Sequence, residues 1–461
     1  MARRWEAGLV AGSPIASTLH SMSNLSYMPS EGLTYDPNEE KYWDLEALDL
    51  EVRRAFEICH GCRMCFKYCD SFPSLFKLLD DRYDGEVHGL NDADVASVMD
   101  ACFQCKLCEV QCPYTPRDAH QFQLDFPKLV HRYTANRRLR NPATLRDRVL
   151  SDTDAAGQMA RLSFGLANAM NKVPAHRVLM EKALGIHRDK LLPDFASQTF
   201  EAWATDNDLI RQDPGPEAVL FQTCYVQNNE PGIGKDVLEV MAKNEVDIAC
   251  LRDLQCCGMP SWESGDLATL RAKAEANLKI LGPHAKAGAK IIVINPTCSM
   301  MLRREYAELV HPRDKELAEL VAAAVMDPGE FLWSMRKKPR FNTDFKSGPK
   351  SVAYHAPCHL RAQAVGFKGR DLLKKLPETT VKPVMECCGH DGTHAMKVET
   401  FEASKKAGQR SFDGMQAIEA EVWSTECPLA AIQFEQHAGQ RALHPMTILA
   451  RAYRGDSFGP E

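Results

Sequence analysis

The chain lacks the features that mark membrane-spanning, nucleic-acid-binding and nucleotide-binding proteins. Its longest apolar runs, such as IIVINPTCSMML from Ile291, are shorter and more interrupted than the roughly 20 residues of a membrane-spanning helix. The formal net charge of -6 gives no basic excess for a nucleic-acid partner. No G-x-G-x-x-G fingerprint follows a strand and GIGK at Gly232 lacks the Walker spacing, so flavin and ATP sites are not supported.

The N-terminus also lacks a sustained apolar segment. An arginine pair opens the chain, but Glu6 interrupts the weak apolar stretch that follows, so we expect a tail rather than a signal peptide over residues 1–50. A cytoplasmic location is the expectation that follows. In that setting the 17 cysteines indicate metal or redox sites rather than disulfides.

Eight cysteines form two copies of one spacing, C-x2-C-x2-C-x3-C. They are Cys59, Cys62, Cys65 and Cys69, then Cys102, Cys105, Cys108 and Cys112. This is the cluster-binding run of two-cluster ferredoxins, in which the last cysteine of each run ligates the other cluster. We therefore expect two [4Fe-4S] clusters, one held by Cys59, Cys62, Cys65 and Cys112 and the other by Cys102, Cys105, Cys108 and Cys69. Zinc, which takes four thiolates from two separated pairs, is the less fitting alternative.

The segments around these runs are predicted to be helical. Apolar periodicity predicts helices over residues 42–58, 71–81 and 92–101, with Asn91 as the N-cap of the last. This arrangement resembles the alpha-helical ferredoxin domain found in succinate dehydrogenase and heterodisulfide reductase.

Beyond Pro214 the remaining cysteines mark a duplication. The copies are Cys224, Cys256, Cys257 and Cys298, then Cys358, Cys387, Cys388 and Cys427, and the second starts 134 residues after the first. Each cysteine or pair follows a candidate strand, and strands alternate with helical segments, which predicts parallel α/β layers. Ligands bind at the carboxyl ends of such strands, so we expect one site per repeat. Cys250, the one cysteine outside these sets, is predicted to lie in the core.

Two ferredoxin runs followed by two C…CCG…C repeats resemble the cysteine-rich (CCG domain) iron-sulfur oxidoreductases. That family includes the iron-sulfur components of anaerobic glycerol-3-phosphate dehydrogenase and glycolate oxidase, and heterodisulfide reductase. The resemblance implies that the repeat cysteines bind metal, in one or two further iron-sulfur clusters. The full family motif ends C-x-x-C, whereas Met301 and Ala430 occupy the last position here. Four cysteines per repeat suffice for a cube but not for the five-thiolate cluster of the disulfide-reducing members.

The fold class is thus predicted as α+β multidomain. The boundaries that we expect are an N-terminal tail over 1–50, an alpha-helical ferredoxin domain over 51–140, a helical connector over 141–213, a first CCG domain over 214–345 and a second over 346–461. In the connector, Met159, Leu162, Leu166, Met170 and Val173 form a helical apolar stripe. We interpret it as a domain-packing face, with a membrane-surface or partner-docking face as the alternative.

Histidines gather around the second repeat. His355, His359, His390 and His394 are either structural or able to hydrogen-bond to sulfur and carry protons coupled to electron transfer. His390, next to Gly389, is the candidate for redox tuning.

The main hypothesis is an iron-sulfur electron-transfer subunit of an oxidoreductase. The resemblance implies a flavoprotein dehydrogenase of the glycerol-3-phosphate, glycolate or lactate type as donor, and a quinone or another redox protein as acceptor. It also implies a peripheral contact with the inner face of the cytoplasmic membrane. The alternatives are disulfide reduction at the CCG site, electron donation to a rubrerythrin-type protein and a structural metal-binding scaffold. Whether the chain itself catalyses a reaction is left open by its sequence.

Overall fold

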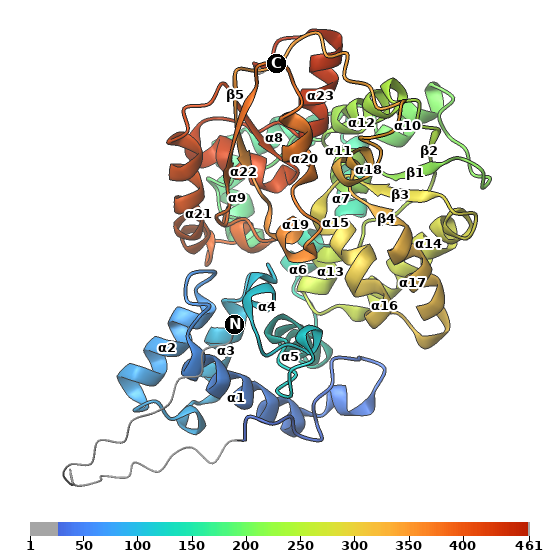
Figure 1. Ribbon diagram of the computed structural model, residues 1–461. Helices are drawn as coiled ribbons and strands as arrows, with labels where there is room; N and C mark the ends of the chain where they lie inside the picture. The colour runs from blue at the N-terminus through green and yellow to red at the C-terminus, as the bar shows by residue number, and fades with distance from the viewer. Residues whose placement is uncertain (1–25, 460–461) are drawn as a thin grey trace, which may run out of the picture.

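The computed structural model describes residues 26–459 (Figure 1). The N-terminal half of the expected tail, residues 1–25, lies outside the described residues. From position 40 onward the chain is folded, which is earlier than the expected boundary at 51. The 3-10 helix η1 (Glu40–Trp43) places Tyr42 in the core, and the buried Arg132 side chain donates to the Tyr42 carbonyl oxygen at 2.8 Å.

The ferredoxin domain is a helical layer that lies below both sheets in Figure 1. Its further elements are α1 (Leu45–Cys62), α2 (Ser71–Arg82), η2 (Val87–Gly89), α3 (Asp92–Asp100), α4 (Leu107–Gln111), η3 (Pro116–Asp118) and α5 (Phe126–Arg140). The three predicted helices correspond to α1, α2 and α3. Asn91 caps α3 as expected, because its side chain accepts from the Asp94 backbone while Asp94 accepts from the Asn91 backbone.

The connector is helical, as predicted. It comprises α6 (Leu145–Ser151), α7 (Thr153–Leu162), α8 (Leu166–Asn171), α9 (Pro174–Leu184) and α10 (Phe200–Asp206). The domain-packing interpretation of its apolar stripe is wrong for most positions. Met159 is 72% exposed, Leu162 76% and Leu166 61%, while Gly157 and Ala160 form the buried side of α7. An apolar stripe with a period of 3.6 residues identifies a helix face, but not what covers that face.

The first repeat is a four-stranded parallel sheet in the order β2-β1-β3-β4. Its elements are β1 (Ala218–Phe221), α11 (Thr223–Asn228), α12 (Pro231–Lys243), β2 (Ile248–Cys250), α13 (Met259–Glu263), α14 (Leu267–Lys286), β3 (Lys290–Val293), α15 (Pro296–Met300), the π-helix η4 (Met301–Glu305), α16 (Tyr306–Leu309), η5 (Pro312–Asp314), α17 (Lys315–Ala324), β4 (Val325–Met326) and α18 (Pro328–Ser334). Cys250 is buried in the core, as predicted.

The second repeat is a three-stranded parallel sheet in the order β6-β5-β7. It contains β5 (Ser351–His355), α19 (Cys358–Gln363), α20 (Lys368–Leu373), β6 (Thr380–Val384), η6 (His394–Met396), α21 (Phe401–Gln416), β7 (Val422–Thr425), α22 (Pro428–Ala438) and α23 (Pro445–Arg454). The mixed architecture of a helical ferredoxin domain followed by two α/β repeats is therefore confirmed.

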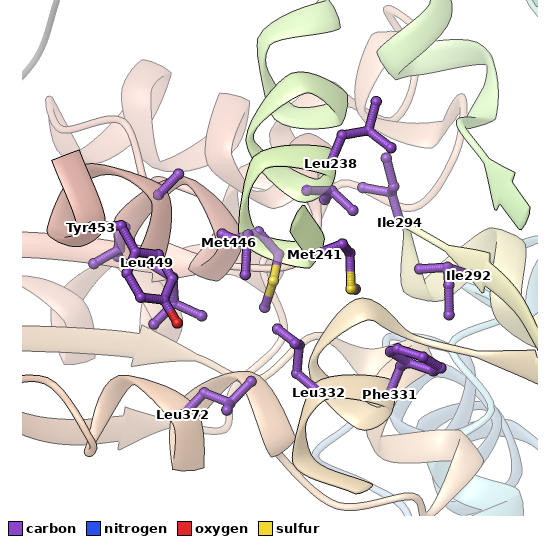
Figure 2. Packing of buried hydrophobic residues seen from close by; sticks show 14 of the residues in the cluster. Leu238, Met241, Ile292, Ile294, Phe331, Leu332, Leu372, Met446, Leu449 and Tyr453 are labelled. Atoms are coloured by element: carbon purple, nitrogen blue, oxygen red, sulfur yellow. The ribbon is translucent and has the colours of Figure 1, made fainter. Parts of the chain in front are cut away.

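The two repeats share one hydrophobic core (Figure 2). The last helix, α23, packs against α12 of the first repeat, and α18 packs against α20 of the second. Figure 2 shows Met446 of α23 near Met241 of α12 and Leu332 of α18, with Leu449 beside Tyr453 on α23. Because this core draws on both copies, burial of their apolar side chains fixes the repeats against each other.

Buried ion pairs join the ferredoxin domain to the first repeat, and a buried hydrogen bond joins it to the second. Lys106 of the ferredoxin domain pairs with Glu305 of η4, and both side chains are buried. Arg304 donates to both carboxylate oxygens of the buried Glu109 at 3.1 Å. From the second repeat, the His359 imidazole lies 3.1 Å from the Gln104 carbonyl oxygen. The segment that carries the second cysteine run is therefore held from two sides.

The shared core predicts that a substitution in the last helix destabilises the repeats together. We expect Leu449→Ala to lower the free energy of unfolding by about 2–5 kcal/mol, because it leaves a cavity between α23 and its neighbours. Urea denaturation followed by far-UV circular dichroism measures this. Leu320→Ala on α17, where the side chain is 37% exposed, is the control and should stay within about 0.5 kcal/mol. Equal effects of the two changes would contradict the shared core.

Candidate functional site

The two ferredoxin runs fold alike around their central cysteines. Arg63, which follows Cys62, has φ 53°, and Lys106, which follows Cys105, has φ 58°. Both are in the left-handed region, which costs a residue with a side chain roughly 1–2 kcal/mol. The same strained turn at the same place in both runs lets the backbone reverse between two cysteines, as it must in order to wrap around a common ligand.

Four cysteines line one pocket of the ferredoxin domain. We call Cys59, Cys62, Cys65 and Cys112 the N-terminal set. The rest of the pocket wall is mainly apolar, from residues that include Ile58, Phe72, Phe76 and Leu124. Burial raises the pKa of Cys59, and the neighbouring thiols of Cys65, Cys112 and Cys62 raise it further. Thiols gathered in an apolar pocket fit an iron-sulfur cluster, because iron supplies the positive charge that stabilises the thiolates.

The second predicted grouping is also brought together. We call Cys102, Cys105, Cys108 and Cys69 the junction set. Burial raises the pKa of Cys108 well above its usual range, and Cys105, Cys102 and Cys69 add to the effect. The crossed arrangement, in which the last cysteine of each run joins the other set, is thus the one that the fold forms. The assignment of the eight cysteines as ligands stays a prediction.

The repeat cysteines lie at the carboxyl ends of their strands, as the topology predicts. We call Cys224, Cys256, Cys257 and Cys298 the first-repeat set, and Cys358, Cys387, Cys388 and Cys427 the second-repeat set. Cys224 lies on α11 directly after β1, and Cys358 begins α19 after β5. Within the first set, Cys224 and Cys257 both hydrogen-bond to Cys256 and lower its pKa well below the usual value.

Glycine makes the tight turn after each cysteine pair. Gly258 has φ 86° and Gly389 has φ 74°, conformations that glycine adopts without strain. A Cβ at Gly389 would strike the Ser404 carbonyl oxygen and lie 2.8 Å from the Gly408 amide nitrogen. Helix α21 therefore packs directly on the backbone of the CCG turn, which fixes the direction of both thiols.

The positions that replace the fifth family cysteine are structural. Met301 is buried in the core of the first repeat, and Ala430 is buried among Phe412 and Phe434 of the second. Neither side chain offers a thiolate. Each repeat set is left with four cysteines.

The four sets form a continuous line. The Cys65 sulfur of the N-terminal set lies 4.0 Å from the Cys108 carbonyl oxygen of the junction set. Cys105 of the junction set belongs to a small apolar cluster against which Cys358 and Cys387 of the second-repeat set pack. Beyond them, the hydroxyl of Thr297, next to Cys298 of the first-repeat set, lies 2.8 Å from the imidazole of His359, next to Cys358 of the second-repeat set. The order is therefore N-terminal, junction, second-repeat, first-repeat.

Each set also has one buried cation nearby, which sequence reasoning missed. Arg54 stabilises the thiolate of Cys59, Lys106 that of Cys102, Lys273 that of Cys256 and Lys190 that of Cys388. Three of these cations have a carboxylate partner: Glu51 for Arg54, Glu305 for Lys106 and Asp154 for Lys273. Lys106 and Arg54 lie in or next to the cysteine runs, but their type alone does not show that they are buried. Lys190 and Lys273 lie in segments without a motif, so no sequence signal marks them.

The connector also contributes to the first-repeat site. Asp154 of α7 accepts a hydrogen bond from the Cys256 backbone at 3.1 Å and one from Lys273 at 2.6 Å. Helix α7 thus covers this thiol set with its buried side. Residues 141–213 contain no cysteine. Their sequence therefore gives no sign that the connector lies next to the first-repeat set.

The predicted histidines surround the second-repeat set, but three have structural partners. His355 lies 3.1 Å from the Thr425 hydroxyl, His359 2.8 Å from the Thr297 hydroxyl, and His394 packs on Phe103 at 4.5 Å between ring centroids. Burial lowers the pKa of each to about 4. His390 is buried with its Nδ1 atom unpartnered, and burial lowers its pKa well below the usual range. A redox-tuning role for His390 stays a prediction.

Within residues 26–459 no group of three His, Cys, Asp or Glu side chains converges so as to hold a single metal ion. An iron-sulfur cluster requires a different arrangement of ligand atoms from a single metal ion. In a cube each thiolate binds its own iron atom, so the four sulfurs surround the ligand instead of meeting at one point.

Comparison with known proteins assigns iron-sulfur and cysteine-rich domains to the segments that carry the four sets. A 4Fe-4S dicluster domain matches residues 58–115, and the Cysteine-rich (CCG) domain matches twice, over residues 218–303 and 352–435. The chain carries a 4Fe-4S dicluster domain and two CCG domains. The resemblance that the cysteine spacings indicated is thus confirmed, as is the prediction of iron-sulfur clusters.

Three relatives illustrate the similarity. One subunit of the anaerobic glycerol-3-phosphate dehydrogenase of Escherichia coli is 28% identical over 313 residues, covering 67% of this chain and 77% of the relative. Lactate utilization protein A of Shouchella clausii is 27% identical over 186 residues, 39% of this chain and 74% of the relative. One subunit of the fumarate reductase (CoM/CoB) of Methanothermobacter marburgensis is 24% identical over 246 residues, 52% of this chain and 46% of the relative.

The CCG turn of the second repeat gives a direct test of the site. We expect Gly389→Ala to lower the urea midpoint and to release the iron of the second repeat, because the new methyl group forces the cysteine pair away from α21. Iron analysis and urea denaturation measure the two effects. Gly288→Ala is the matched control, since Gly288 also has a positive φ, 89°, but open space around a Cβ. That change should cost only about 1–2 kcal/mol and no iron; iron retention in both variants would contradict the account.

Proposed function

We propose that the chain is an iron-sulfur electron-transfer subunit that relays electrons along its four thiol sets. The observation that carries this proposal is the continuous order of the four sets, in which each set, or a residue directly next to it, contacts the following set. Iron-sulfur clusters, when bound, supply one-electron transfer at potentials that the surrounding protein tunes. The chain's own part is to bury the thiols, to exclude water from them and to fix the distance between neighbouring sets.

The names of the relatives support an oxidoreductase partner. One is a subunit of a glycerol-3-phosphate dehydrogenase and another is a lactate utilization protein. We propose that the donor is a flavoprotein dehydrogenase of the glycerol-3-phosphate, glycolate or lactate type, and that the acceptor is a quinone or another redox protein. The buried Met301 and Ala430, in place of a fifth cysteine, favour this relay over disulfide reduction at the repeats.

The order of the sets can be tested by electron paramagnetic resonance. In the fully reduced chain, neighbouring clusters broaden each other's signals through magnetic coupling. We expect Cys105→Ser to sharpen the signals of both the N-terminal and the second-repeat clusters, since the junction set lies between them. Cys224→Ser, at the far end, is the matched control and should sharpen only the second-repeat signal. A change in the N-terminal signal in the Cys224→Ser variant would contradict the order.

We further propose that the connector docks the chain on an anionic membrane surface. No helix of the described residues is long and apolar enough to span a bilayer. Around the turn between α7 and α8, however, Met159, Leu162, Phe164 and Leu166 are between 61% and 95% exposed. The exposed cations Arg140 and Arg148 precede this turn in the sequence, and the exposed Lys172 follows it. Apolar side chains bordered by basic ones favour the interface of anionic lipids.

Vesicle sedimentation tests this docking. We expect the chain to bind vesicles that contain anionic lipid, and Phe164→Glu to weaken binding at least tenfold, because a carboxylate replaces the most exposed apolar side chain. Leu320→Glu, at an exposed apolar position outside the connector, is the control and should bind as the native chain does. Equal binding by all three proteins would overturn the proposal. Loss of binding only when a copurifying protein is removed would assign the face to a protein partner instead.

A further inference from the structure

Lys190 is the one cation among the four near the thiol sets that has no acidic partner. Its side chain is only 3% exposed, and among residues 26–459 no carboxylate lies within ion-pair distance of it. Its ammonium group donates instead to the neutral amide oxygen of Gln433 at 2.5 Å. The other three cations, by contrast, are balanced by Glu51, Glu305 and Asp154. An unbalanced buried ammonium is costly, since burial removes its hydration without supplying a counter-charge.

The surroundings of Lys190 lead to the second cysteine pair. The Gln433 amide that accepts from Lys190 donates, through its nitrogen, to the Cys388 carbonyl oxygen at 3.1 Å and to the Ser404 hydroxyl at 3.4 Å. The Ser404 hydroxyl in turn donates to the Gly389 carbonyl oxygen at 2.6 Å. Lys190 is thus joined through one buried side chain to the backbone of the CCG turn.

The segment that carries Lys190 is itself fixed. The buried guanidinium of Arg177 donates to the Lys190 carbonyl oxygen at 2.7 Å and to the His187 carbonyl oxygen at 2.8 Å. The neighbouring Leu191 amide donates to Gln436 on α22 at 3.1 Å. The charge is therefore held in place by the connector, and is not carried there by a mobile surface lysine.

Electrostatics agrees with this placement. Burial lowers the pKa of Lys190 to about 8, and Cys388 opposes this effect by favouring the charged form of Lys190. The Lys190 charge in turn favours the thiolate form of Cys388. The same charge lowers the pKa of two neighbouring imidazoles, His390 and His437, in addition to the effect of their burial.

We propose that Lys190 is the counter-charge of the cluster held by the second-repeat set, and that its unbalanced positive charge raises the reduction potential of that cluster. This inference rests on the proposed function, since it needs a cluster on Cys358, Cys387, Cys388 and Cys427. Adding one electron makes the cluster more negative, and a fixed cation in a low-dielectric setting favours that reduced state. The second-repeat set thus differs from the other three sets in having a nearby cation without a carboxylate partner. Lys190 acts as a positioning and tuning residue.

The test is a redox titration of the anaerobically purified full chain, followed by electron paramagnetic resonance. Loss of its signal in Cys388→Ser identifies the second-repeat cluster. We expect Lys190→Met to shift the one-electron reduction equilibrium of this cluster at least tenfold toward the oxidised form, which corresponds to about 59 mV. Lys190→Arg, which keeps the charge, should stay near the native potential. Gln433→Glu, which gives Lys190 a carboxylate partner, should shift the potential in the same direction as Lys190→Met.

Lys182→Met is the matched control. It is the same substitution in the same connector, but Lys182 is exposed near the end of α9, so solvent screens its charge and the potential should not move. An unchanged potential in Lys190→Met, with the signal present, would overturn the inference and leave the proposed function standing. Absence of any second-repeat signal in the native chain would instead contradict the proposed function. If Lys190→Met alone loses the cluster while Lys190→Arg keeps it, the counter-charge is supported; loss in both variants overturns it.

Discussion

The cost of burying thiolate charge governs this structure. Sixteen of the 17 cysteines are gathered in four sets, and burial raises the thiol pKa in most of those for which a shift is resolved. Such thiols become thiolates only where positive charge compensates them. Bound iron would be the main source of that charge, and one buried cation near each set adds to it. The glycine turns and the ion pairs between domains all serve to hold these groups at fixed positions.

The docking of the ferredoxin domain follows from the same constraint. The segment between Cys102 and Cys112 must face the second-repeat set to continue the line, and it is mostly buried there. The pair of Lys106 with Glu305 and the pair of Glu109 with Arg304 sit within this interface. Breaking a buried pair leaves an uncompensated charge, which costs several kcal/mol. These buried ion pairs therefore fix one relative position of the ferredoxin domain and the repeats.

Individual strands, a helix cap and the cysteine groupings could be predicted, because each depends on residues that are close together in the sequence. The strands before Cys224, Cys298, Cys358 and Cys427 and the cap at Asn91 follow from short patterns, and the cysteine groupings follow from spacing alone. The order of the sets could not be predicted, because contacts such as that between Cys105 and the second-repeat cysteines join residues some 250 positions apart. Lys190 lies in a segment without periodicity, so only the folded chain brings it near Cys388. The apolar stripe of the connector predicts a packing face, and this prediction fails because exposed and buried apolar faces have the same periodicity.

The central claim is that all four thiol sets, including those of the repeats, bind iron-sulfur clusters that form one continuous series. Mössbauer spectroscopy of the full chain, purified anaerobically from iron-57 medium and combined with iron and sulfide analysis, tests this most directly. The account predicts more iron than the roughly eight atoms of two ferredoxin cubes, with the additional iron in exchange-coupled cluster signals that are lost when the repeat cysteines are replaced. Iron limited to two cubes, with zinc or free thiols in the repeats, would contradict it.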